Sequence, residues 1–291
     1  MSSLRRRSIV TIVAPSTSRG SHTVEWSFDK HRAAIVVLSA VTLVALFAPV
    51  LAPSNPTVPV DQPFLAPFTA SHLLGTDSVG RDELSRVLFG IRSSWISAIA
   101  VIFFGVLIGG IVGMVAGVSN TRVDSALMRI TDGFLAFPGP VLAIAVVASL
   151  GASLLHTLIA VAIVWWPFYA RIVRGEARAI MSRPHIEAAK TFGVGKVRLA
   201  MRHVLPGVIP AVIVTASLDV GNLVITLSGL SFLGLGAPAP APELGAMAAR
   251  NLQYLLQQWW VCVMPALAIA VMAIISNFAG DALRDFGSRG N

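Results

Sequence analysis

A stretch of 38 residues without a single Asp, Glu, Lys or Arg, residues 133–170, constrains the fold of this chain more than any other feature. A helix of about 20 apolar residues is enough to cross the hydrocarbon core of a bilayer, so this stretch is too long for one crossing. The segment GASLLH at residues 151–156 has the small and polar residues of a turn. The stretch therefore predicts two membrane spans, near residues 133–150 and 157–174.

Four further apolar segments have a similar length and carry almost no charge. They cover about residues 33–52, 94–119, 207–229 and 259–281. With 55% hydrophobic and only 12% charged residues, the 291-residue chain has the composition of a polytopic membrane protein and not of a soluble domain. We therefore expect an all-α fold: a six-span transmembrane domain over residues 33–286, preceded by a basic cytoplasmic tail at residues 1–32, most of it flexible.

The basic residues are distributed unevenly between the loops. If the N-terminal tail is inside, the inner segments hold 18 of the 22 Lys and Arg residues and the outer segments hold 4. Because an excess of Lys and Arg marks cytoplasmic loops, we expect a multi-pass protein of the plasma (inner) membrane with both termini in the cytoplasm. This distribution also accounts for the net charge of +8 without a nucleic-acid partner.

Catalytic and metal-binding patterns are absent from the sequence. The single Cys262 cannot form an intramolecular disulfide or a multi-cysteine metal site, and no two histidines are spaced i,i+4. Gly195 and Lys196 lack both the preceding glycine and the following Ser or Thr of a phosphate-binding loop. We therefore expect a non-catalytic chain with no metal site and no cofactor of its own.

Two further segments predict local structure. Residues 53–92 begin with several prolines, which predict an irregular loop. Their later part places Asp82, Glu83 and Arg86 opposite apolar residues, which predicts a short amphipathic helix lying on the membrane surface. Residues 230–258 predict a second irregular loop.

Four glycines in the second span repeat every four residues. Such a repeat leaves one helix face smooth, so that another helix can pack closely against it. These residues are Gly105, Gly109, Gly113 and Gly117.

One acidic residue, Asp219, lies well inside the fifth predicted span. A carboxylate within the membrane is costly and suggests a functional role. The sequence is compatible with two roles: Asp219 lines a translocation path together with Asn222, or it forms a structural hydrogen bond to Asn222 or to a neighbouring helix.

The loop between the fourth and fifth spans, residues 182–206, is rich in charge and lies between two apolar segments. Charged side chains are not placed in lipid without a large cost, so the loop projects into the cytoplasm. Ser182 as N-cap and Pro184 in the first turn predict a short helix. A bend at the glycines and a second short helix follow, and Pro206 is expected to end that helix where the next span begins.

The same loop resembles the EAA loop of the membrane subunits of ATP-binding-cassette importers. The full spaced pattern is E-A-A, three residues, Gly, nine residues, and H-x-L-P. It is matched here by Glu187, Ala188, Ala189, Gly193, His203, Leu205 and Pro206. In that family the loop docks in a groove of a separate ATPase subunit, so the resemblance implies that these residues form the ATPase-coupling surface. The alternative, a basic loop that only sets topology, does not require the spacing.

Several other segments are similar to one branch of these importers, the dipeptide and oligopeptide permeases. They are GTDSVGRDELSRVLFG at 75–90, MRITDGFLAFP at 128–138, YARIVRGE at 169–176, LSFLGLG at 230–236 and GDALRD at 280–285. Relatives often carry an acidic residue shortly before LSFLG, where this chain has Leu227.

The resemblance implies a set of partners. A homologous second permease would complete the translocation path, and two ATP-binding subunits would dock on loops such as 182–206 and use ATP and Mg²⁺. An extracytoplasmic solute-binding protein would deliver the peptide.

Three alternatives are considered at this point. One is a nickel or metal-chelate importer of the same family. Another is a proton-coupled secondary transporter with Asp219 as the proton carrier, a class that usually shows an internal repeat. The third is a structural membrane scaffold, which would not need the spaced E-A-A pattern.

Overall fold

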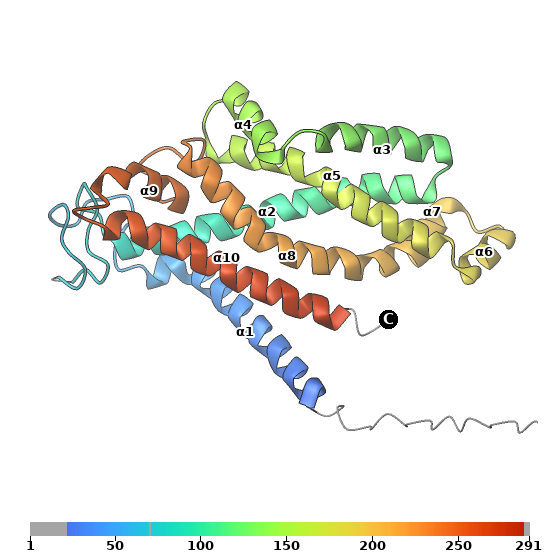
Figure 1. Cartoon of the computed structure of the whole chain (residues 1–291), viewed down its shortest axis with the longest axis horizontal. Coiled ribbons are helices and arrows are strands. Elements are labelled where there is room, and N and C mark those ends of the chain that lie inside the picture. Colours follow the sequence, from blue (N-terminus) through green and yellow to red (C-terminus); the bar gives the residue numbers. More distant parts are fainter. Residues whose placement is uncertain (1–21, 70, 288–291) are drawn as a thin grey trace, which may run out of the picture.

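The computed structural model describes residues 22–69 and 71–287, and these residues form an almost entirely helical chain without a named strand (Figure 1). The all-α prediction is confirmed. The longer helices are α1 (His22–Leu51), α2 (Glu83–Val118), α3 (Thr121–Leu135), α4 (Gly139–Leu150), α5 (Leu154–Met181), α8 (Leu205–Phe232) and α10 (Trp260–Gly287). The shorter ones are α6 (Pro184–Thr191), α7 (Lys196–Leu199), the π-helix η1 (Ala200–Val204), α9 (Leu244–Arg250) and the 3₁₀-helix η2 (Leu252–Tyr254).

The long helices lie side by side, with the α6 and α7 loop at one end of the bundle and α9 at the other (Figure 1). Among the described residues, four helical segments are long and apolar enough to cross a membrane: α2, α5, α10 and the continuous segment Lys196–Phe232. The apolar part of α1, Val36–Leu51, is shorter. The pair α3 and α4 passes the same test only as one broken span. These helices are compatible with six spans, and that number stays a prediction.

The third predicted span, residues 133–150, is not a straight helix. Helices α3 and α4 meet at an angle of 83°. The break falls at residues 136–138, where Pro138 precedes α4 and Pro140 lies in its first turn. Proline cannot donate a backbone hydrogen bond, so it begins a helix more readily than it continues one. Hydropathy alone contains no signal for this bend.

Helix α1 begins at His22, so residues 22–32 are helical, whereas residues 1–21, the larger part of the predicted flexible tail, lie outside the described residues. The expectation of a separate surface helix is wrong. The amphipathic surface helix is instead the first part of α2, which begins after Asp82 and continues into the second span. Its polar side chains are the buried ones.

An ion-pair cluster accounts for the burial of Arg86 on this polar face. The Asp77 carboxylate, 1% exposed, lies 2.6 Å from Nε of Arg81 and 3.4 Å from Nε of Arg86. Arg86 also donates from Nη1 to the carbonyl oxygen of Pro56 at 2.7 Å. Buried charges are tolerated only when they are paired and hydrogen-bonded. The proline-rich segment therefore folds over the end of α2 instead of leaving its polar face in water.

The four glycines do form the predicted contact. Their face of α2 packs on α5 so closely that a Cβ atom at Gly109 would lie 2.3 Å from the carbonyl oxygen of Trp166. A Cβ atom at Gly113 would lie 2.4 Å from that of Ala170. Only glycine allows two helix backbones to approach this closely.

The second predicted irregular loop, residues 230–258, contains the short helix α9. Glu243 caps it by accepting hydrogen bonds from the backbone nitrogens of Gly245 and Ala246, at 3.3 and 3.0 Å. Leu244 and Met247 are buried, and Leu244 contacts α2 at Gly90. Helix α9 therefore closes one end of the bundle.

Candidate functional site: the loop between α5 and α8

The first half of the loop is the helix α6. Pro184 occupies its first turn, as predicted. Ser182 does not cap it: Ser182 is the C-cap of α5 and donates its hydroxyl to the carbonyl oxygen of Ala179 at 2.9 Å, while Arg183 takes the N-cap position of α6. Only Ser182 and Arg183 separate α5 from α6, which leaves no long linker between them.

A Schellman motif ends α6 and forms the bend. The backbone nitrogen of Val194 donates to the carbonyl oxygen of Ala189 at 3.1 Å, and that of Gly193 donates to Lys190 at 2.9 Å. This pattern requires a left-handed residue after the C-cap, and Gly193 has φ +78°. The glycine of the motif is therefore explained by backbone geometry alone.

The inner face of the loop is anchored by a small apolar core. Ile186 from α6, Leu199 from α7 and Val204 from η1 are all buried. They pack on α5 and α8 through Val173, Ala177, Ile180 and Val208. Burying one such side chain contributes about 1.5–3 kcal/mol. The loop is consequently a rigid extension of the bundle, and a force on α6 acts directly on α5 and α8.

The second half of the loop does not end at Pro206. Helix α7 continues through the π-helix η1 into α8, and Pro206 lies in the first turn of α8. The wider π-turn releases the backbone of this stretch from the regular α-helical pattern, so a proline can be accommodated without a break. The predicted second short helix is thus the first part of one continuous helix, Lys196–Phe232.

The outer face of the loop combines apolar and basic side chains. Phe192, Val197 and Met201 are 88%, 77% and 60% exposed. Lys190, Lys196, Arg198 and Arg202 are also exposed. Large apolar groups next to basic groups on a projecting surface are typical of a protein-binding site. The family pattern does not include these three apolar residues. In the sequence they can be recognised as large apolar side chains within a highly charged loop.

The motif residues divide between the two faces. Glu187, Ala188, His203 and Pro206 are exposed, whereas Ala189 and Leu205 are half-buried. Ala189 packs against the anchoring core. The ammonium group of Lys190 donates to the carbonyl oxygen of Met181 at 3.3 Å and not to Glu187. The motif therefore shapes the loop from within and leaves Glu187 available on its surface.

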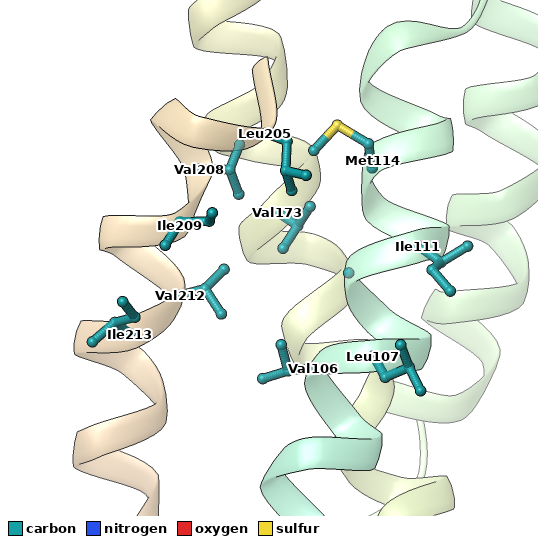
Figure 2. Close-up of a pocket in the computed structure, with 11 residues that line it drawn as sticks. Val106, Leu107, Ile111, Met114, Val173, Leu205, Val208, Ile209, Val212 and Ile213 are labelled. Atoms are coloured by element: carbon teal, nitrogen blue, oxygen red, sulfur yellow. The ribbon is translucent and has the colours of Figure 1, made fainter. Parts of the chain in front are cut away.

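Leu205 also lines an apolar groove of about 400 Å³ between α2 and α8. Figure 2 shows Val208, Val212 and Val173 on the walls of this groove, with Met114 from α2 facing Leu205. The walls offer no side-chain hydrogen-bond partner. A polar solute would leave its hydrogen-bonding groups unsatisfied there, at several kcal/mol each, so this groove does not suit a polar solute.

Ion pairs join α3 to the end of α5 that leads into the loop. Asp124, 3% exposed, accepts from Nη2 of Arg174 at 2.8 Å and from Nη2 of Arg178 at 2.6 Å. Arg171 pairs with Asp132 at 2.7 Å. The sequence alone did not reveal this connection, because the partners are about 40 to 50 residues apart.

Asp219 and Asn222 lie at mid-length of α8, far along the chain from the loop residues. The Asp219 carboxylate, 6% exposed, accepts a hydrogen bond from Nε1 of Trp165 on α5 at 3.3 Å, and Asn222 lies beside it. Asn222 itself is exposed. The geometry of Asp219 is that of an interhelical hydrogen bond. A role of either residue in the translocation path stays a prediction.

We expect Asp219→Asn to assemble normally and to keep most transport, because an amide oxygen can still accept from Trp165. Asp219→Leu should lower stability by about 1–2 kcal/mol, since it leaves the indole N–H unpaired between helices. Thermal unfolding in detergent and substrate uptake in vesicles would be measured for both. Loss of uptake in a normally assembled Asp219→Asn variant would instead assign the carboxylate to the path.

A bundle of long apolar helices that carries an anchored, projecting helix–bend–helix loop is the architecture expected of a membrane permease subunit. The chain belongs to the family described as binding-protein-dependent transport system inner membrane component, whose model matches residues 105–289. Within that family its relatives place it among the dipeptide and oligopeptide permeases of ATP-binding-cassette importers, which are multi-pass inner-membrane proteins.

Two peptide permeases and one nickel permease are among its relatives. The probable D,D-dipeptide transport system permease protein DdpC of Escherichia coli (strain K12) is 41% identical over 86% of this chain and 84% of its own length. The di/tripeptide transport system permease protein DppC of Pseudomonas aeruginosa (strain UCBPP-PA14) is 37% identical over 86% and 85%. The nickel transport system permease protein NikC of Escherichia coli (strain K12) is 37% identical over 87% and 92%.

A solved structure supports the fold. The inward-facing MetNI methionine ABC transporter aligns with a TM-score of 0.54 at 20% identity, covering 69% of this chain and 95% of the transporter chain. At this identity the likeness concerns the fold alone.

Proposed function

We propose that this chain is the permease subunit of an ATP-driven importer of dipeptides or oligopeptides. It forms the translocation path with a homologous second permease and receives substrate from an extracytoplasmic solute-binding protein. Two ATP-binding subunits dock on the cytoplasmic loops of the two permeases, and residues 182–206 are the docking loop of this chain. The observation that carries the proposal is the loop itself: a rigid projection with an exposed apolar and basic outer face. The peptide permeases among its relatives support the substrate class.

The proposed coupling follows from how the loop is anchored. ATP and Mg²⁺ would be bound by the partner ATPases, whose closure moves the docked loops. Because α6 packs on α5 and α8 without a flexible linker, its displacement would turn these helices as a body. A rigid-body movement of this kind can switch a central cavity between inward and outward access.

A nickel or metal-chelate importer is the second candidate, because a nickel permease is 37% identical to this chain. The two substrates can be separated directly. The complex would be purified with its binding protein, and the bound ligand identified by mass spectrometry and elemental analysis. Peptide in the binding protein, and peptide uptake into vesicles that requires ATP, would support the proposal. Bound nickel with no peptide would overturn it. Because the chain belongs to the importer family, the proton-coupled secondary transporter considered from the sequence is no longer a candidate.

The proposed orientation predicts which positions are accessible from outside the cell. Single cysteines would replace Asp61, Gln257 or Lys196, all exposed, in a Cys262→Ala background. We expect an impermeant thiol reagent to label the first two in intact cells and to label position 196 only after the cells are opened. Labelling at position 196 in intact cells would contradict a cytoplasmic loop and with it the charge asymmetry on which the orientation rests.

A further inference from the structure

One face of α3 carries two arginines that have no role in the coupling loop. Arg122 and Arg129 lie seven residues apart, two helical turns, with Ser125 and Ala126 between them on the same face. Together with Thr121 these residues line a shallow groove of about 390 Å³. The groove therefore presents two guanidinium groups and two hydroxyl groups to one space.

The acids of α3 are engaged elsewhere. Asp124 is buried on the opposite face and held by Arg174 and Arg178 of α5, and Asp132 pairs with Arg171. Among the side chains that the structure describes, those of residues 36–69 and 71–284, neither Arg122 nor Arg129 has an ion-pair partner. The helix thus separates its charges, with carboxylates directed to α5 and unpaired arginines directed away from the bundle.

The position of α3 sets the depth of this groove in the membrane. The uncharged part of α2, residues 93–118, is roughly 39 Å long at helical rise, enough to cross the hydrocarbon core of about 30 Å. Arg122 follows four residues later and so lies at head-group level. The backbone of Arg129 lies roughly 10 Å deeper, at the rise of seven helical residues. Side chains on a helix lean toward the N-terminus of the helix, so the guanidinium of Arg129 extends back toward the head-group level, as arginine does at a membrane boundary.

Exposed apolar side chains flank the arginine face. Ile130 is 56% exposed and Val123 is 39% exposed, and both lie about a quarter turn from Arg122 on α3. An acyl chain could lie along these residues while its head group occupies the groove. Cationic groups at head-group level beside apolar groups at acyl-chain level match the two parts of a phospholipid.

We infer that this face of α3 binds the phosphate of an anionic phospholipid. The two guanidinium groups would bind the phosphodiester oxygens through charge-assisted hydrogen bonds, and the hydroxyls of Thr121 and Ser125 would donate to the same oxygens. A zwitterionic head group would place its own cation next to the arginines, so the groove should prefer phosphatidylglycerol over phosphatidylcholine. The preference does not depend on which substrate the importer carries.

The test is lipid retention by the purified full-length chain. The protein would be exchanged into detergent containing equal amounts of phosphatidylglycerol and phosphatidylcholine, and bound lipids counted by native mass spectrometry. We expect a preference for phosphatidylglycerol that falls roughly tenfold or more in Arg122→Gln/Arg129→Gln, since each basic residue at the surface contributes strongly to anionic lipid binding. Arg122→Lys/Arg129→Lys should keep part of the preference.

The matched control removes two positive charges elsewhere. The double variant Arg92→Gln/Arg250→Gln lowers the net charge by the same amount, at the end of the bundle where α9 lies. It should keep the preference for phosphatidylglycerol. An equal loss in this control, or no preference in the unmutated protein, would overturn the inference. So would protection of α3 from hydrogen exchange by inorganic phosphate but not by phosphatidylglycerol. If the Arg122→Gln/Arg129→Gln variant retains lipid normally but no longer co-purifies with the ATPase, the face is a protein contact and the lipid assignment is wrong.

Discussion

Replacing Gly113 by leucine is expected to abolish the folded bundle. A Cβ atom at this position would lie 2.4 Å from the carbonyl oxygen of Ala170 and 2.8 Å from Cβ of Val173. The first of these atoms belongs to the backbone of α5 and cannot rotate away. Helices α2 and α5 would have to separate along their shared face, which loses packing over several turns. Overpacking of a well-packed core usually lowers stability by about 1–3 kcal/mol. We expect the cost of this backbone clash to be at or above the upper end of that range.

The matched control is Gly110, three residues earlier on the same helix, where an added Cβ would meet nothing within 4 Å. Gly110→Leu should therefore fold, and Gly110→Ala should be slightly more stable than the unmutated chain, because glycine in a helix interior costs about 0.5–1 kcal/mol relative to alanine. Size-exclusion profiles and thermal unfolding in detergent would be compared. Equal stability of Gly113→Leu and Gly110→Leu would show that the glycine stripe does not set the distance between α2 and α5.

The glycine stripe could be predicted from the sequence because the information is local. A repeat of four residues defines one helix face, and small residues on it specify close approach. The α3–α4 break is harder to predict for the opposite reason: residues 133–150 are almost uniformly apolar, and hydropathy does not distinguish a straight helix from a bent pair. Pro138 and Pro140 were visible, but proline inside a membrane helix can equally produce a mild kink.

The loop shows the same division between local and non-local information. The position of the bend could be read from Gly193, because a Schellman motif involves only consecutive residues. The sequence could not show that Ile186 and Leu199 are buried on α5 and α8, since those contacts depend on how the two helices pack. The burial of the polar face of α2 could not be predicted for the same reason: besides Asp77, Arg86 bonds the carbonyl oxygen of Pro56, 30 residues away.

Replacing Gly193 by valine should leave the bundle folded and disrupt its coupling to ATP hydrolysis. Nothing lies within 4 Å of an added Cβ, so the change creates no steric clash with other parts of the chain. The cost is confined to the backbone: φ is +78°, a left-handed conformation that costs a residue other than glycine about 1–2 kcal/mol, and more when it is β-branched. Relieving this strain turns α7 and the exposed Phe192 away from their positions.

Gly195 provides the control within the same loop. It also has open space around it, but its φ of −64° suits any residue, so Gly195→Val adds the same side chain without the strain. Substrate uptake, ATP turnover and ATPase co-purification would be measured on the same reconstituted preparations. We expect Gly193→Val to lower uptake per ATP hydrolysed several-fold, or to weaken ATPase co-purification, while Gly195→Val matches the unmutated complex in all three.

Glu187→Lys tests the surface of the loop instead of its shape. The Glu187 side chain is exposed and lies in the first turn of α6, where a carboxylate stabilises the helix by only about 0.3–1 kcal/mol. Reversing its charge should therefore leave folding unchanged. A partner that contacts this acid through a basic group would be repelled, and co-purification of the ATPase should fall. If both Glu187→Lys and Gly193→Val transport and hydrolyse ATP normally, the loop sets only topology, because a docking surface cannot tolerate both a changed shape and a reversed charge.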